Sequence, residues 1–410
     1  MTQPHSLQGA HKALTGIKIL DLTSVIMGPV CTQILGGYGA QVVKVESPEG
    51  DIMRHAGAQC EPEMGSMFLH VNHYKKSIVI DLKTEDGRKL LWKLIPEYDV
   101  IVHNIRRDAI ERLGFGYAAV KAARPDIIYV ALSGYGEGGP YAAKPAFDDI
   151  IQAQAGLASL YAEQTGSEPA YLPSLIVDRF TGVAAAHRVL ASLFRRQACG
   201  AGEYVNVSMF ETMAEFVLSD HLGGKTFDPV DGKTGYSRLL TRHRRPYKTS
   251  DGYIAAVVYN DKHWKAFFEL IGQPEKFSDN RFGSAAGRAS NYDTIYKYLA
   301  DTFETNTSTY WIETLTAADI PCAMVNNVAM LANDPHLKAV GFFTEYSHDR
   351  SGVSYVAVNK SAAGQEHQPP GKGQQTIEVL AGHGFTSEAI DELLKNKVIH
   401  NGQHELGLGK

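Results

Sequence analysis

Short apolar runs alternate with amphipathic segments along the first third of the chain. Apolar runs bounded by glycine or polar residues predict buried strands, and segments that repeat apolar residues at helical spacing predict helices. The runs predict five strands, at residues 16–22, 41–46, 77–82, 99–104 and 125–132. Helices are predicted between them, at residues 28–35, 86–95 and 108–113. This alternation is typical of a parallel sheet with helices on its faces.

A parallel sheet gathers the carboxyl ends of its strands at one edge, where ligands commonly bind. Polar residues close several of the predicted strands, so the segments that follow them are candidate site loops. These segments follow Asp21, Glu46, Asp81, Asn104 and Ser133. We expect them to lie near one another.

The composition changes near residues 223–225 and through a basic stretch at 238–245, which precedes a predicted strand at 252–258 and an amphipathic segment at 262–272. A chain of 410 residues also exceeds the size at which one hydrophobic core keeps growing. We therefore predict an α/β protein with several parts. They are a Rossmann-like parallel-sheet large domain at 1–220, a smaller α+β domain at 221–330, and a segment at 331–410 that returns to the large domain.

Asp178 is the most informative candidate for chemistry. It closes an apolar run at 174–178, and a helical pattern follows, which predicts a strand-to-helix turn. Free N–H groups and the helix dipole at such a turn keep a carboxylate ionised and lower its pKa. An ionised, oriented carboxylate can act as a nucleophile. The local pattern alone favours a simple helix N-cap, and the reactive interpretation stays open beside it.

Two neighbouring motifs also carry two interpretations. Asp148 and Asp149 precede Ile150, so the pair predicts a helix cap, and one of them is the candidate for a second carboxylate beside Asp178. The segment 134–139 satisfies the G-x-G-x-x-G spacing of dinucleotide sites. Such a site must open a helix, whereas two prolines follow here. A flexible glycine-rich loop is therefore favoured over a dinucleotide site.

Composition narrows the class of partner. The chain has 45 acidic and 40 basic residues, a formal charge of −5, which argues against a nucleic-acid or membrane-surface protein. The basic residues Arg238 and 242–245 offer a site for phosphates, although a solvated or interface face is favoured. The start of the chain lacks a signal-peptide pattern, and no apolar stretch is long enough to span a bilayer. We expect a soluble cytoplasmic protein that acts on small molecules.

Cysteine and histidine spacing gives no sign of a metal. The cysteines lie far apart without a C-x-x-C pair, which fits a reducing compartment and predicts neither a zinc site nor a disulfide framework. They are Cys31, Cys60, Cys199 and Cys322. His400 and His404 have helical spacing, but Gly402 lies between them, so we predict no metal site there.

Taken together, motifs along the chain resemble the class III CoA transferases of the CaiB/BaiF type. That family includes formyl-CoA transferase and carnitine CoA transferase, and alpha-methylacyl-CoA racemases are close relatives. The similarity runs from about residue 14 to residue 400, and its motifs occur in order. The matching stretches include 14–23, 39–46, 75–78, 103–104, 133–136, 249–254 and 320–323, together with Asp178 and Gly182.

The resemblance implies an acyl-CoA:carboxylate CoA transferase in which Asp178 attacks the donor thioester. An aspartyl anhydride and then an aspartyl-CoA thioester would follow, with Asp148 as a supporting carboxylate. CoA and acyl-CoA are substrates in this scheme, and no permanent cofactor, ATP or metal is needed. Relatives form interlocked homodimers, so we expect self-association.

The resemblance also implies where CoA binds. Lys83, Arg106 and Arg112 would offer positive charge to its phosphates, and Lys144 would lie near the pantetheine end. By similarity, the groove is lined by Ile26, Met27, Ile80, Asp81, Leu82, Lys83, Asn104, Ile105, Arg106 and Arg112.

Departures from the relatives narrow the substrate. Formyl-CoA transferase has glutamine where this chain has Ile26, and its glycine-dense loop has no counterpart here, which argues against oxalate and formate. An arginine that contacts CoA in that relative is replaced by Ser47. The racemases have Gly-His-Asp where this chain has Ala146, Phe147 and Asp148, so one catalytic base is missing.

Basic residues such as Arg179 suit a dicarboxylate, and we expect succinyl-CoA as donor. Two alternatives stay open beside the transferase. The first is a 2-methylacyl-CoA epimerase, which would exchange the alpha proton with heavy water without any acceptor acid. The second is a catalytically silent CoA-binding protein, which would bind CoA tightly and turn over no acid.

Overall fold

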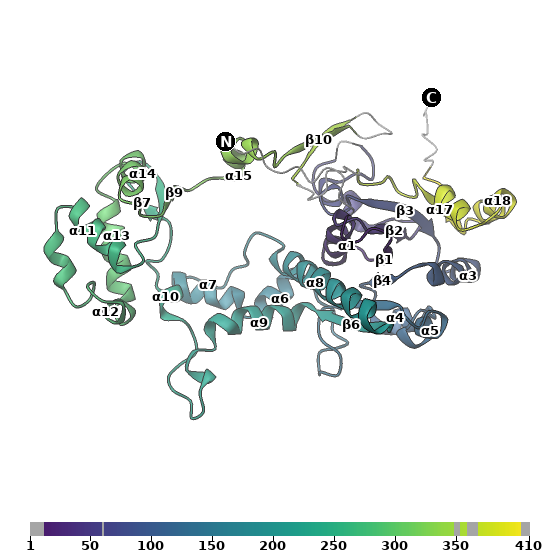
Figure 1. The fold of residues 1–410 in the computed structure, drawn as a ribbon, viewed down its shortest axis with the longest axis horizontal. Coiled ribbons are helices and arrows are strands. Elements are labelled where there is room, and N and C mark those ends of the chain that lie inside the picture. The colour runs from purple at the N-terminus through teal and green to yellow at the C-terminus, as the bar shows by residue number, and fades with distance from the viewer. Residues whose placement is uncertain (1–11, 60, 348–352, 359–367, 403–410) are drawn as a thin grey trace. The chain divides into compact units, whose positions relative to one another are not determined.

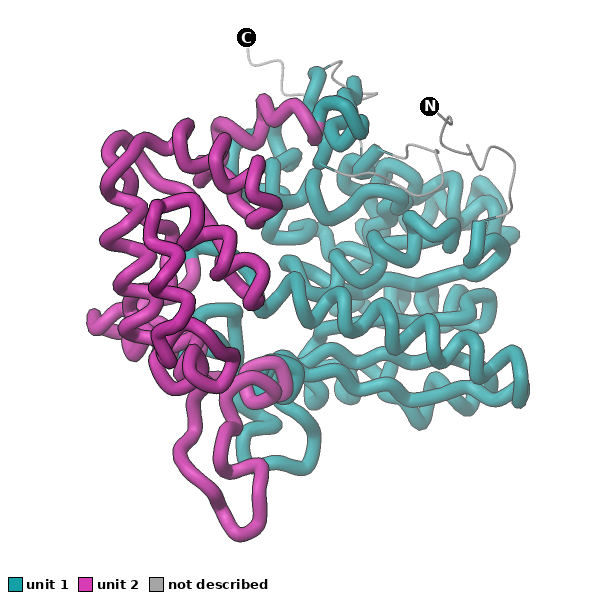
Figure 2. The backbone as a smooth tube through the Cα atoms, turned by 60° about the vertical axis from the view of Figure 1, so that its left-hand side comes forward, with its two compact units in different colours: residues 1–154, 173–214, 338–410 teal, residues 155–172, 215–337 magenta. Residues whose placement is uncertain are grey.

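The computed structural model describes residues 12–59, 61–347, 353–358 and 368–402. The chain divides into two compact units, coloured teal and magenta in Figure 2. Unit 1 comprises residues 1–154, 173–214 and 338–410, and unit 2 comprises residues 155–172 and 215–337. Among the described residues, no helix combines the length and the apolar character needed to cross a membrane.

A seven-stranded sheet with the order β12-β3-β2-β1-β4-β5-β6 forms the centre of unit 1 (Figure 1). Neighbouring strands are parallel, except that β12 pairs antiparallel with β3. The strands are β1 (Lys18–Leu22), β2 (Gln41–Glu46), β3 (Lys75–Ile80), β4 (Val100–His103), β5 (Ile128–Ser133), β6 (Glu203–Ser208) and β12 (Ile399–His400). The predicted α/β class and all five predicted strands are confirmed, and β6 and β12 are additional.

Helices connect and cover these strands. The predicted helices at 28–35, 86–95 and 108–113 correspond to α1, α3 and α4. The helices of unit 1 are α1 (Met27–Gly37), α2 (Ser66–Leu69), α3 (Glu85–Leu94), α4 (Arg107–Arg112), α5 (Tyr117–Ala123), α6 (Asp148–Gln154), α8 (Ile176–Cys199), α17 (Thr376–Gly382) and α18 (Ser387–Lys395). Helix α9 (Met209–His221) begins in unit 1 and ends in unit 2. A hairpin of β10 (Thr344–Ser347) and β11 (Ser354–Ala357) also belongs to unit 1.

The two faces of the large sheet differ in character, because successive side chains of a strand point to opposite faces. On one face, Leu20, Val43 and Ile78 join a core with residues of α3, α5, α17 and α18. Lys44 and Glu46 occupy the alternate positions of β2 and are nevertheless buried. The second face therefore combines charged residues with the packing of α1, which contacts both β1 and β2.

Unit 2 is an α+β structure with an aromatic core. Its antiparallel sheet contains β7 (Tyr247–Lys248), β8 (Tyr253–Ala256) and β9 (Cys322–Met324). Trp264, Phe267, Phe303 and Trp311 are among the residues buried in its core. Its helices are α7 (Leu157–Thr165), α10 (Ser237–Leu240), α11 (Asp261–Leu270), α12 (Ala285–Ala289), α13 (Tyr292–Phe303), α14 (Ser308–Ala317) and α15 (Val328–Leu331), and α16 (Pro335–Ala339) lies at its end.

The strand predicted before Asp178, at residues 174–178, is wrong. The apolar run at 174–178 is not extended, because α8 begins at Ile176 and already includes Val177 and Asp178. Val177 is fully buried within the first turn of this helix. A short apolar run fits a buried helix turn as well as a strand, and here the long helical pattern that follows decides the conformation.

Candidate active site

Asp178 lies in the first turn of α8 and faces a second carboxylate. The backbone N–H of Asp178 donates to Asp148 Oδ2 at 2.9 Å, and Gln152 Nε2 donates to Asp148 Oδ1 at 2.7 Å. Gln152 Nε2 also donates to the Ser174 carbonyl at 3.2 Å, which ties α6 to the segment before α8. Asp148 thus accepts a hydrogen bond from a free N–H group at the start of α8. This bond fixes the backbone position of Asp178.

The predicted cap is therefore on the wrong residue. Leu175 occupies the N-cap position of α8, and Asp148 supplies the accepting oxygen from another helix. Asp148 is the first residue of α6, and its side chain accepts from the Asp178 N–H and from Gln152 Nε2 rather than from a backbone N–H of its own helix. The Asp178 carboxylate accepts no hydrogen bond from the part of the chain that the structure describes. It is free to meet a ligand.

The pKa of Asp178 is raised, whereas the sequence predicted a lowered value. Burial raises it to about 7, the nearby Asp148 carboxylate adds to the rise, and Arg179 acts in the opposite direction. Loss of hydration and like-charge repulsion thus outweigh the favourable end of the helix. A carboxylate that ionises near neutral pH is more basic than an ordinary aspartate, which suits attack on a carbonyl carbon.

Helices α1 and α8 approach each other closely beside Asp178. A Cβ atom on Gly182 would lie 2.6 Å from the Met27 carbonyl oxygen and 2.9 Å from Val30 Cβ. Only glycine fits between the two helices at this point. Gly182 lies one helical turn after Asp178, so the contact holds the first turn of α8 against the start of α1.

Gly182→Ala is expected to destabilise unit 1 by about 1–3 kcal/mol, because the added methyl group meets a backbone oxygen that cannot rotate away. Denaturant unfolding measures this change. Gly37→Ala in α1 is the matched control, since its Cβ would meet Tyr74 at an ordinary 3.7 Å. Equal stability of the two variants would contradict the proposed packing.

The loop that leads into α1 is held by backbone-directed hydrogen bonds. Asn104 Oδ1 accepts from the Ser24 N–H at 3.0 Å, and Asn104 Nδ2 donates to the Ser24 carbonyl at 2.8 Å. Asp51 Oδ1 accepts from the N–H of Val25, whose φ is 71°. The carboxamide of Asn104 thus bonds both the N–H and the carbonyl of Ser24 and fixes the shape of the loop.

Ile26 and Met27 at the start of α1 are also shaping residues. Ile26 is fully buried with Val30 and Val71, and Met27 is 6% exposed. Their side chains fill the space under the loop, so a ligand there meets mainly backbone. The polar glutamine of the formyl-CoA relative would be costly in the apolar surroundings of Ile26.

Charged residues buried beneath this loop were missed as a group. Lys75 Nζ lies 3.1 Å from Asp21 Oδ2, and Lys44 Nζ lies 2.9 Å from Asp51 Oδ2. Burial acts to raise the pKa of Glu46, but Arg54, Lys44 and the Ser77 hydroxyl together outweigh it and bring that pKa to about 2. The signal in the sequence was a lysine and a glutamate inside otherwise apolar strands.

The remaining predicted CoA residues lie on loops after β3, β4 and β5. Ile80 is buried and Leu82 packs against the core, while Asp81 Oδ1 accepts from the Lys83 N–H at 2.9 Å. Ile105 also packs on that core. Lys83 is exposed and lies 3.4 Å from Glu49.

The predicted cations are available to solvent. Arg106 and Arg112, at the two ends of α4, are exposed and form no ion pair with any described residue. Lys144 is exposed, with its Nζ 4.1 Å from the centre of the Tyr141 ring. Positive charge thus follows β3, β4 and β5 at the edge where their carboxyl ends meet.

The glycine-rich loop after β5 is anchored at its base. Gly136 N–H donates to both carboxylate oxygens of Glu211 at 3.0 Å, and a Cβ on Gly134 would lie 2.3 Å from Ala146 Cβ. The next helix, α6, begins only at Asp148. The loop therefore lacks the helix that a dinucleotide site requires. Its return past Ala146 brings Asp148 to the edge of the sheet.

Among the described residues, no group of three or more His, Cys, Asp or Glu side chains is placed to hold a metal ion. His404 and Cys60 lie outside the described residues.

Comparison with known proteins finds CoA transferases among the chains that are similar to this one. The chain is 32% identical to an acyl-CoA transferase of Fusarium pseudograminearum, over 96% of this chain and 90% of that protein. It is 28% identical to the succinyl-CoA:glutarate CoA-transferase of Homo sapiens, over 98% and 93% of the two chains. The crystal structure of Rv3272 from Mycobacterium tuberculosis superposes with a TM-score of 0.76 at 27% identity, covering 89% of this chain and 98% of that chain. Residues 14–376 match the CoA-transferase family III profile, and the chain belongs to that family.

Proposed function

We propose that Asp178 is the covalent nucleophile through which this acyl-CoA:carboxylate CoA transferase moves CoA between two acids. The observation that carries the proposal is the half-buried Asp178 carboxylate, whose pKa is raised to about 7 beside Asp148. Such a group is ionised in much of the population at neutral pH and is only weakly hydrated. Both properties favour attack on a thioester.

The reaction proceeds by four acyl exchanges. The Asp178 carboxylate attacks the donor thioester, and the C–S bond breaks. CoA thiolate departs, and a mixed anhydride between Asp178 and the donor acyl group remains. The thiolate attacks the Asp178 carbonyl of this anhydride, which releases the donor acid and forms an aspartyl-CoA thioester. The acceptor carboxylate then attacks that thioester to give a second anhydride. Thiolate attack on the acceptor's carbonyl yields the new acyl-CoA and restores Asp178.

Asp148 acts as a positioning residue in this scheme. Its hydrogen bond to the Asp178 N–H fixes the first turn of α8, and its charge keeps the nucleophile basic. Lys83, Arg106 and Arg112 bind the phosphates of CoA, and Lys144 lies toward the pantetheine arm. These roles rest on the exposure of the four cations at the sheet edge.

Transfer activity is expected to rise with pH through a midpoint near 7, because the ionised form of Asp178 is the nucleophile. Asp148→Asn removes the neighbouring charge while keeping an oxygen that can accept from the Asp178 N–H. The midpoint should then move to lower pH. kcat/KM measured from about pH 5 to pH 9 tests this, and an unmoved midpoint assigns the titration to another group.

The proposed donor is succinyl-CoA and the proposed acceptor is another carboxylic acid. The human relative is named for succinyl-CoA and glutarate, and Arg179 follows Asp178 directly with a charge that can pair with a free carboxylate. A panel of acyl-CoA donors against mono- and dicarboxylates, with CoA transfer followed by chromatography, tests this choice. Faster transfer from acetyl-CoA than from succinyl-CoA would reject the donor without affecting the role of Asp178.

We also propose a homodimer. Phe180, Val183 and Phe194 lie on the exposed side of α8, with Phe194 76% exposed, and a partner surface would remove this apolar area from water. Light scattering should give the mass of two chains, and the mass of one chain would overturn the proposal.

A reducing cytoplasm is the proposed location, because Cys31, Cys199 and Cys322 are free thiols.

A further inference from the structure

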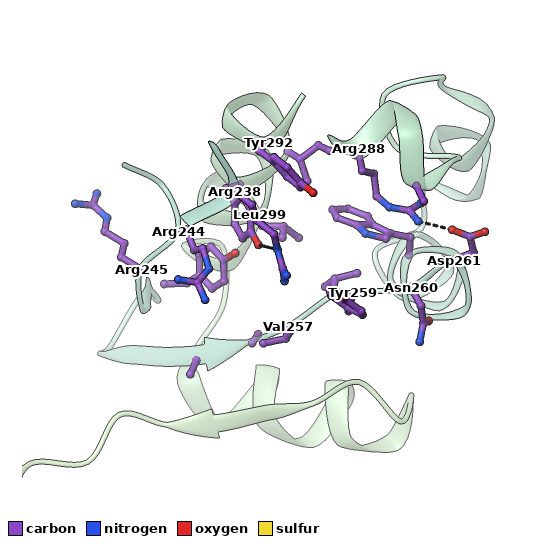
Figure 3. A pocket seen from close by; sticks show the side chains of 18 of the residues that line it. Arg238, Arg244, Arg245, Val257, Tyr259, Asn260, Asp261, Arg288, Tyr292 and Leu299 are labelled. Carbon is purple, nitrogen blue, oxygen red and sulfur yellow. Dashed lines mark hydrogen bonds and ion pairs between the residues drawn. The ribbon is translucent and has the colours of Figure 1, made fainter. Parts of the chain in front are cut away.

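Unit 2 contains a cavity of about 820 Å³ whose lining includes none of the residues assigned above to the transfer reaction. It lies between the β7–β8 region and helices α11, α12 and α13, and its walls combine arginines with aromatic rings (Figure 3). This volume falls within the range of sites for drug-sized ligands, roughly 300–1,000 Å³. It is larger than a four- or five-carbon diacid needs.

The positive charge of the cavity is only partly neutralised. Arg288 pairs with Asp261, and Lys262 pairs with Asp319 at 2.6 Å. Arg238 and Arg244 also line the cavity, and neither has a carboxylate partner among the described residues. Figure 3 shows both of these side chains turned into the cavity, whereas Arg245, which also lines it, points away from its centre. The cavity therefore presents two uncompensated guanidinium groups.

Arg238 is held in place by its neighbours. Its Nε donates to the Tyr296 hydroxyl at 3.1 Å, and its guanidinium carbon lies 4.8 Å from the centre of the Tyr259 ring. Tyr259 is 61% exposed, so ring surface remains for a ligand. An oriented guanidinium binds a phosphate or carboxylate with two parallel hydrogen bonds, and the exposed ring can stack on a flat group.

We propose that this cavity binds a nucleoside phosphate, with the phosphates at Arg238 and Arg244 and the base against Tyr259. A multiply charged anion can pair with the two guanidinium groups. A flat base can stack on the aromatic wall and fits the volume of the cavity. The proposal concerns a site in unit 2 and does not depend on the role of Asp178.

Isothermal titration of the full-length chain with ADP, pyrophosphate and glutarate tests it. Arg238→Gln/Arg244→Gln is expected to weaken ADP binding by at least about tenfold, since charge-assisted hydrogen bonds are lost. The matched control is Arg242→Gln/Lys233→Gln, which removes the same charge from unit 2. Arg242 and Lys233 are exposed, and neither lines the cavity. The control should bind ADP like the parent chain.

Two further arms separate the alternatives. Tyr259→Leu should weaken ADP by about tenfold and leave pyrophosphate unchanged, because only ADP has a base to stack. Arg106→Gln/Arg112→Gln alters the loops of unit 1 and should leave the unit 2 affinity intact. The proposal is overturned if only this last variant loses ADP, if Arg242→Gln/Lys233→Gln weakens ADP as much as Arg238→Gln/Arg244→Gln does, or if glutarate binds more tightly than ADP.

Discussion

Asp178→Ala is expected to lower the rate of CoA transfer by roughly 10³-fold or more, because every covalent intermediate in the scheme forms on this carboxylate. The loss should appear in kcat for all donors and acceptors alike. The affinity for CoA should change little, since the cations that we propose to bind its phosphates lie on other loops. Steady-state transfer assays together with CoA titration measure the two quantities separately.

Asp149→Ala is the matched control for this variant. Asp149 is an exposed aspartate in the first turn of α6, next to Asp148, and has no part in the proposed reaction. Its removal should leave transfer near the parent rate. Substantial activity in Asp178→Ala, or a comparable loss in Asp149→Ala, would contradict the assignment.

Asp178→Asn separates chemistry from folding. The folded-state pKa of Asp178 lies near 7, above the ordinary value of 3.8, so ionisation of this group costs the folded state stability as pH rises through 7. The neutral amide removes that cost. We expect an inactive variant whose free energy of unfolding at about pH 8 is equal to or higher than that of the parent.

Lys75→Met is expected to destabilise the chain by about 3–5 kcal/mol, because it leaves the buried Asp21 carboxylate without its nearest cation. Lys75 Nζ also donates to Asn72 Oδ1 at 2.9 Å and to the Pro29 carbonyl at 3.0 Å. Burial lowers the pKa of Lys75 to about 8, against the opposite effect of Asp21, so the pair is still mostly charged at neutral pH. Denaturant unfolding measures the difference.

Lys76 provides the control on the same strand. Its Nζ lies 2.7 Å from Glu378, but the two side chains are 53% and 62% exposed. Solvent screens such a pair, so Lys76→Met should cost about 1 kcal/mol or less. Similar losses for the two variants would mean that the buried network contributes no more than a surface pair.

The sheet could be predicted because its strands are apolar runs separated by polar or glycine residues. β2 at Gln41–Glu46 agrees with its predicted limits, and the other four strands differ by a few residues at their ends. β12 could not be predicted in this way. It contains two residues and depends on pairing with β3, far away in sequence.

The pairing of Asp178 with Asp148 was predicted, but the geometry that brings them together was not. Asp178 and Asp148 were both singled out, yet the strand before Asp178, its cap role and its lowered pKa were wrong. Each of these errors has the same cause: burial of Asp178 and the approach of α6 are tertiary effects that local spacing does not contain. Gly182 was noted only as part of a motif. Its structural role is the close contact with Met27, which local sequence does not reveal.

The basic run at 242–245 shows the same limit in unit 2. Its residues look equivalent in sequence, but Arg244 is turned into the cavity, Arg245 points away, and Arg242 is not part of the lining. Arg238, several residues earlier, completes the pair with Arg244. A short helix, α10, and the turn that follows it decide which side chains face inward.

The most direct test of the account is to trap the covalent intermediate. The chain is incubated with succinyl-CoA, quenched with hydroxylamine, digested and mapped by mass spectrometry. We predict a hydroxamate on Asp178, formed only when donor is present and absent from Asp178→Asn. A hydroxamate at another residue would contradict the central claim, as would full transfer activity in Asp178→Asn.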